Sequence, residues 1–143
     1  MKKLSEQLTE LASRATKLEK NATAAQQENK AKLEARIETA KAETKTMHQT
    51  FNARVQSMEA KTSEHWTELK QNFDNRIKQI KQDVDERKDS RDLKRAQKRA
   101  DRTENNAEAA IYFALYSIAE AEVAVLEALD ARAFASSLEE NAA

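Results

Sequence analysis

Apolar residues recur along the first part of the chain in steps of four, three and four residues, which together make a unit of 11. The pattern runs from Leu18 to Val84 without a slip. Eleven residues fill three turns at about 3.67 residues per turn, close to about 3.6 for an α-helix, so these positions share one face of a long helix. We call its large apolar members the seam and expect them to meet a partner helix in an oligomer. The seam consists of Leu18, Leu33, Met47, Phe51, Val55, Met58, Trp66, Leu69, Phe73, Ile77, Ile80 and Val84.

The chain before this repeat has a related pattern. Residues 4–25 carry apolar residues at alternating steps of four and three, which is the heptad pattern of a coiled coil. Between residues 22 and 40 the repeat positions are small or polar, so they bury little area and predict a weakly held section. Asn29 lies there, and two interpretations stay open: it fixes the register or oligomer number, or the packing is simply loose at this point.

The last 41 residues, 103–143, show a broader apolar pattern. Apolar side chains cover nearly half of the helical circumference here, so one partner helix cannot cover them. We therefore predict an amphipathic C-terminal helix that folds back as a hairpin or joins an oligomeric helical bundle. The centre of this face is formed by Ile111, Leu115, Ile118, Val125, Leu126 and Leu129.

A charged stretch, residues 85–102, separates the two patterns. Two places in this part of the chain could end the long helix. One is Asp89–Ser90, and the other is 103–106, where Asn105 and Glu108 have the spacing of a capping box. We favour a break or bend near 103–106. The expected fold is all-α, with a long coiled-coil helix over residues 1–102 and an acidic, Ala-rich amphipathic helix over residues 103–143.

The composition agrees with an all-helical chain. Gly and Pro, the main helix breakers, are absent, and 35% of the residues are charged. Cys is absent too, which fits a reducing compartment. No apolar run follows Lys2 and Lys3, and no stretch of 18 residues is free of charge, so we expect neither a signal peptide nor a spanning helix. We expect a cytoplasmic protein.

The charges balance over the whole chain and not within its parts. Residues 103–143 hold eight acids and one base, a net charge of −7, while residues 1–102 carry +7. Five bases cluster between Lys94 and Arg102, but no aromatic residues are interleaved with them and acids lie close by. We therefore expect a solvated face or a docking strip for the acidic segment, and not a nucleic-acid interface.

Residues that carry chemistry are few. The two histidines, His48 and His65, lack the paired Glu-x-x-His pattern of metal sites in helical bundles. A chain without glycine has no glycine-rich phosphate loop. We predict no catalytic activity, no metal and no cofactor.

The 11-residue amphipathic repeats between Leu33 and Val84 resemble those of exchangeable apolipoproteins. The Ala-rich body without Gly and Pro, followed by an amphipathic bundle segment, is similar to bacterial phasins, which coat polyester storage granules. Two functions are therefore expected as alternatives. The first is a scaffolding coiled coil that associates with itself as a dimer to tetramer. The second, implied by the resemblance, is a peripheral coat on a lipid or granule surface.

Overall fold

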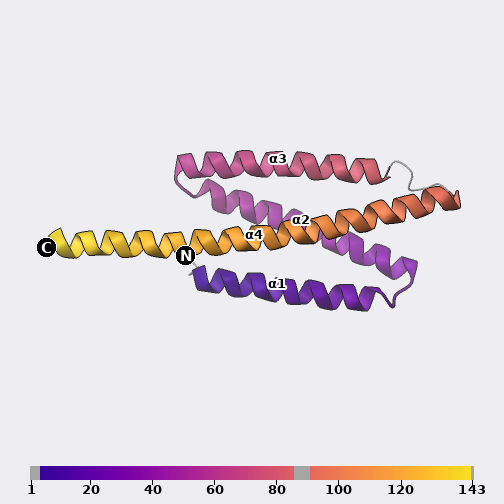
Figure 1. Ribbon diagram of the computed structural model, residues 1–143, viewed down its shortest axis with the longest axis horizontal. Coiled ribbons are helices and arrows are strands. Elements are labelled where there is room, and N and C mark those ends of the chain that lie inside the picture. Colours follow the sequence, from indigo (N-terminus) through magenta and orange to yellow (C-terminus); the bar gives the residue numbers. More distant parts are fainter. Residues whose placement is uncertain (1–3, 86–90, 143) are drawn as a thin grey trace. The chain divides into compact units, whose positions relative to one another are not determined.

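The computed structural model describes residues 4–85 and 91–142, and the side chains of residues 84 and 85 lie outside this description. The described chain forms four helices and no strand, which confirms the all-α prediction. They are α1 (Leu4–Ala25), α2 (Lys30–Gln56), α3 (Ala60–Asp85) and α4 (Leu93–Ala142) (Figure 1). The chain divides into two compact units, Met1–Asn72 and Phe73–Ala143, and the division falls inside α3.

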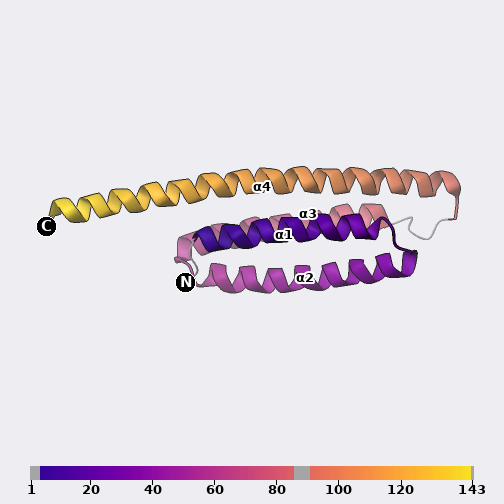
Figure 2. The same ribbon diagram turned by 90° about the horizontal axis from the view of Figure 1, so that it is seen from below.

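In the first unit, α1 and α2 form an antiparallel hairpin (Figures 1 and 2). The carboxylate of Glu43 on α2 forms ion pairs with two residues of α1, Arg14 at 2.9 Å and Lys17 at 3.4 Å. Closer to the turn, the Arg36 guanidinium lies 3.5 Å from the side-chain oxygen of Asn21. The residue numbers rise on one helix as they fall on the other, as an antiparallel pair requires.

The turn between α1 and α2 is closed by polar groups. Its Asn29 adopts an extended backbone (φ −77°, ψ 171°), and its side chain accepts a hydrogen bond from the Lys32 N–H at 3.0 Å. Asn29 is therefore the N-cap of α2, which is a role that asparagine fills well. Neither proposed role on a continuous seam applies to Asn29, because the helix has ended at Ala25 before this residue is reached.

A second turn, residues 57–59, separates α2 from α3. The Ser57 and Met58 N–H groups donate to the carbonyls of Arg54 and Val55, at 3.2 and 3.0 Å. The Ser57 hydroxyl also donates to the Arg54 carbonyl at 2.6 Å. These bonds satisfy carbonyls that a helix end leaves open, so the chain turns here without glycine or proline.

In the second unit, the last part of α3 runs antiparallel to the first part of α4 (Figures 1 and 2). The rings of Phe73 and Phe113 are stacked, with centroids 5.4 Å apart and planes inclined by 23°. Asp92 caps α4: its side chain accepts the Arg95 N–H at 3.0 Å, and its carbonyl accepts the Ala96 N–H at 2.9 Å.

Two predictions about helix boundaries are wrong. The helix expected to continue from Leu18 to Val84 is interrupted at 26–29 and at 57–59, where capping side chains outweigh a weak or interrupted seam. The break expected at 103–106 is absent, since α4 crosses these residues and the Thr103 hydroxyl donates to the Arg99 carbonyl within the helix. The interruption lies between Asp85 and Leu93, and the alternative site Asp89–Ser90 lies outside the described residues.

Side-chain burial is very limited. Among the described residues, Val55 near the end of α2 is the one buried side chain, with 5% of its surface exposed. Large apolar residues on all four helices remain exposed. The individual chain therefore holds its helices through caps, ion pairs and shallow contacts, and little of its apolar surface is removed from water.

Candidate interaction surfaces

The structure distributes the predicted seam over separate helices. Leu18 lies on α1, and Met58 lies in the turn between α2 and α3. The other members follow the helices: Leu33, Met47, Phe51 and Val55 are on α2, and Trp66, Leu69, Phe73, Ile77, Ile80 and Val84 are on α3. The turns break the stripe, so the seam cannot serve as one continuous surface along a single helix.

Most seam side chains remain accessible within one chain. Phe51 and Ile77 are half-buried, while Trp66, at 48% exposed, is typical of those that stay open. Val84 lies outside the described side chains. The structure brings two seam residues into specific packing: Val55 is buried, and Phe73 stacks on a ring of α4.

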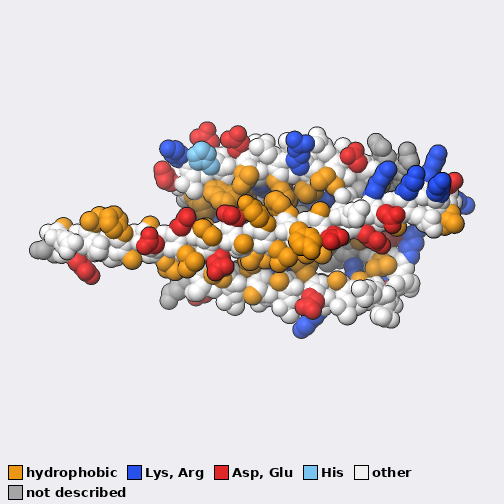
Figure 3. Space-filling view, in the orientation of Figure 1, with side chains coloured by type: hydrophobic (Ala, Val, Ile, Leu, Met, Phe, Trp, Pro, Cys, Tyr) orange, Lys and Arg blue, Asp and Glu red, His pale blue; other side chains and the backbone are white. Residues whose placement is uncertain are grey.

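The predicted C-terminal face lies entirely on α4. Its members Ile111, Leu115, Ile118, Leu126 and Leu129 are exposed, and Val125 is half-buried. Apolar side chains continue along α4 to its C-terminal end, with acidic groups between them (Figure 3). We call Ile111, Leu115, Ile118, Val125, Leu126 and Leu129 the α4 face.

The α4 face points away from the contact with α3. At about 100° per residue, Phe113 lies about 160° around the helix from Ile111 and Leu129. Phe113 packs on α3, so the α4 face lies on the opposite side of the helix. Tyr112 and Tyr116, which flank this face, are also more than half exposed. Nothing in the described part of this unit covers the α4 face.

Charge changes sign along α4. Lys94, Arg95, Lys98, Arg99 and Arg102 occupy the first ten residues of the helix. The segment after them carries the eight acids of residues 103–143 against the single base Arg132. The helix is therefore basic at one end and acidic at the other, with the α4 face between the two ends.

The strongest ion pair of the first unit lies at its first turn. Arg36 on α2 donates through Nε and Nη2 to the carboxylate of Glu28, at distances from 2.6 to 2.9 Å. The hydrogen bond from Arg36 lowers the pKa of Glu28, and the same bond raises the pKa of Arg36. This fork-shaped contact holds the turn against the start of α2.

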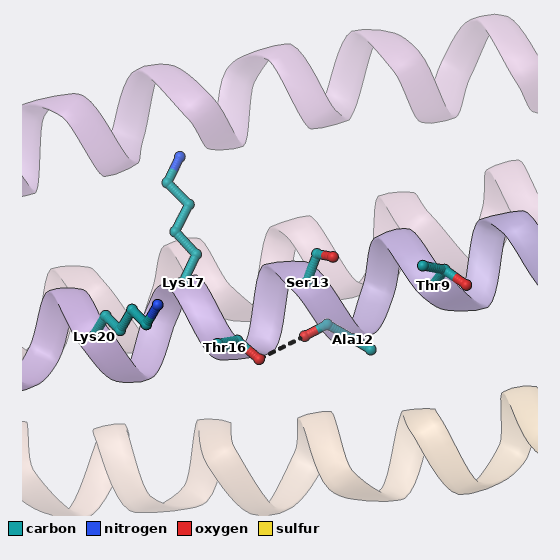
Figure 4. Close-up of a pocket in the computed structure, with 6 residues that line it drawn as sticks. All are labelled: Thr9, Ala12, Ser13, Thr16, Lys17 and Lys20. Carbon is teal, nitrogen blue, oxygen red and sulfur yellow. Dashed lines mark hydrogen bonds between the residues drawn. The ribbon is translucent and has the colours of Figure 1, made fainter.

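A shallow hollow of about 470 Å³ lies along α1 (Figure 4). Its lining residues are Thr9, Ala12, Ser13, Thr16, Lys17 and Lys20. The hydroxyls of Thr9 and Thr16 donate to backbone carbonyls of their own helix, and Lys17 is paired with Glu43. The hollow contains no histidine, cysteine or carboxylate, so its lining offers none of the imidazole, thiolate or carboxylate ligands that metal ions favour.

The described residues contain no group of three His, Cys, Asp or Glu side chains that could hold a metal ion. The capping roles of Asn29, Ser57 and Asp92 were missed from sequence. The signal for the first hairpin was present, because residues of opposite charge lie at mirrored positions about Asn29, with Arg14 and Lys17 on one side and Glu43 on the other.

Among the described helices, α4 alone is long and apolar enough to cross a membrane by length and composition. None of the residues in this apolar stretch is buried. Glu120 and Glu122 follow its uncharged part, residues 109–119. The expectation against a spanning helix rests on the absence of an 18-residue stretch without charged residues, whereas this apolar stretch includes two glutamates.

Comparison with protein-family models, with curated proteins and with solved structures gives no match to this chain.

Proposed function

We propose that this protein is a non-catalytic, cytoplasmic scaffold built by self-association of helices into a dimer to tetramer. One observation carries the proposal: five of the six residues of the α4 face are exposed in the single chain, although the face is apolar apart from Glu122. Large apolar patches on soluble proteins mark interaction sites because leaving them in water is unfavourable. A second copy of the chain is always available to cover such a patch.

The available energy is sufficient for association. Full burial of a Leu or Ile side chain contributes about 1.5–3 kcal/mol. In the single chain, Leu126 is 57% exposed and Leu129 is 58% exposed. Each such residue therefore still has about half of this energy to gain. Several residues on each of two copies can offset an association cost of about 4–15 kcal/mol.

Sedimentation equilibrium of the full chain at micromolar concentration tests this proposal. One chain has a mass of 16.2 kDa, and we expect a mass two to four times larger. A mass that stays at that of one chain throughout the concentration range would contradict the scaffold.

The second candidate function is a peripheral coat on a lipid or storage-granule surface. The observation that favours it is the length of the apolar stretch of α4, which contains no buried residue and includes the exposed rings of Tyr112 and Tyr116. Lying on the surface is favoured over spanning, because a charged side chain at the centre of a bilayer costs on the order of 3 kcal/mol and two glutamates are present.

Co-sedimentation with phosphatidylcholine vesicles distinguishes the two functions. A coat protein should bind the vesicles and lose its oligomeric mass, because lipid and partner compete for the same face. A scaffold should remain in the supernatant with its mass unchanged.

A further inference from the structure

We infer that α4 pairs with the α4 of a second copy in the antiparallel direction, through the α4 face. This inference rests on the proposed self-association and adds the surface, the partner and the orientation. Three observations carry it: the uncovered length of α4, the position of its apolar face relative to α3, and the placement of the carboxylates on that face.

The first observation is the uncovered length. α4 has 50 residues and α3 has 26. Even if α3 lay beside α4 over its whole length, about 24 residues of α4, or about 36 Å of helix, would have no residue of α3 beside them.

The second observation is the position of the α4 face on the helix. It lies opposite Phe113, so a partner helix can cover it without displacing α3. Two copies of α4 and two copies of α3 would then form a bundle with the α4 pair at its centre. Bundles of this kind pack helices nearly parallel or antiparallel, with apolar side chains interlocked along the contact.

The third observation is charge. Glu104, Glu122 and Glu140 are spaced by 18 residues, or five turns, so they share the side of the helix that carries the α4 face. In a parallel pair in register, each of these carboxylates would lie opposite the same residue of the other copy. Centring the α4 face on itself in an antiparallel pair places Ile111 opposite Leu129 of the second copy and Glu122 opposite Ile118, so no carboxylate of this set faces another. Like charges therefore disfavour the parallel arrangement.

The same centring gives a direct test of orientation. Ala107 and Ala133 both lie on the side of the α4 face, and each is opposite the other in the antiparallel pair. Within one helix they are about 39 Å apart. The natural chain has no cysteine, so Ala107→Cys and Ala133→Cys each introduce one thiol on a small, exposed position.

The experiment oxidises each variant alone and as an equimolar mixture, with one variant carrying a mass tag, after sedimentation has shown that each remains oligomeric. Antiparallel pairing predicts a disulfide between the two different variants in the mixture and little disulfide in either variant alone. Disulfides in each variant alone would show parallel pairing and overturn the inference. An oligomer without disulfides in any sample would overturn it as well, because another surface would then carry the association.

These outcomes are separable from failure of the scaffold itself, which would appear as a single-chain mass before any oxidation.

Discussion

Leu129→Ala is the most informative single substitution for the proposed interface. Leu129 is the last residue of the α4 face, lies on the midline of that face around the helix, and is 58% exposed in one chain, so it contributes little to the fold of that chain. If a second copy covers it, the remaining surface is worth about 0.9–1.7 kcal/mol per side chain, taken as 58% of about 1.5–3 kcal/mol. A symmetric dimer contains two such residues and loses about 2–3.5 kcal/mol.

That loss corresponds to a dissociation constant about 30- to 300-fold larger, measured by sedimentation equilibrium. Leu138→Ala provides the matched control. Leu138 has the same side chain on the same helix and is 53% exposed, but nine residues place it about 180° around the helix from Leu129. We expect Leu138→Ala to leave the dissociation constant within about threefold. Equal effects of the two substitutions would refute the assignment of the interface to the α4 face.

Three further predictions concern the caps and charges. Asn29→Ala should lower the stability of the first unit by about 1 kcal/mol, seen as a lower Tm in circular dichroism, because α2 loses its N-cap, whereas Asn52→Ala, within α2 and close to its C-terminal end, should not lower it. The hydrogen bond from Arg36 lowers the pKa of Glu28 below its ordinary 4.5. This contact therefore stabilises the fold above pH 4.5, and its contribution is lost as the pH falls through the lowered pKa. Glu28→Gln should reduce the fall in Tm between pH 5 and pH 3, whereas the control Glu19→Gln should leave that fall unchanged. Glu122→Leu should tighten self-association about tenfold or more, because it removes a carboxylate from the α4 face. The control Glu120→Leu, on the opposite side of α4, should change the dissociation constant little. Equal effects of the two substitutions would contradict the placement of Glu122 on the α4 face.

The sequence predicted the helices better than their ends. The absence of glycine and proline correctly predicts an all-α chain, but it does not imply an uninterrupted helix. Asn29, Ser57 and Asp92 show why that step fails: side chains that bond to nearby backbone groups end or begin helices without a glycine. The seam repeat was regular enough to hide these signals, because helices on either side of a short turn can keep the same spacing.

The opposite error occurred at 103–106. Asn105 and Glu108 have the spacing of a cap, but apolar residues on both sides keep the helical period, and α4 continues through them. The α4 face was predicted from periodicity alone, and all six of its residues lie on one helix. Its partner was beyond prediction from a single chain, because a periodic apolar face specifies that something covers it and not which helix does so.

Self-association is tested most directly by thermal unfolding at two concentrations of the full chain that differ a hundredfold, followed by circular dichroism. Because association stabilises the folded state by mass action, an oligomeric scaffold must have a higher Tm at the higher concentration. We expect the two curves to separate by several degrees. Curves that superimpose at both concentrations would show that the helices are stable without another copy, and this would contradict the proposed function.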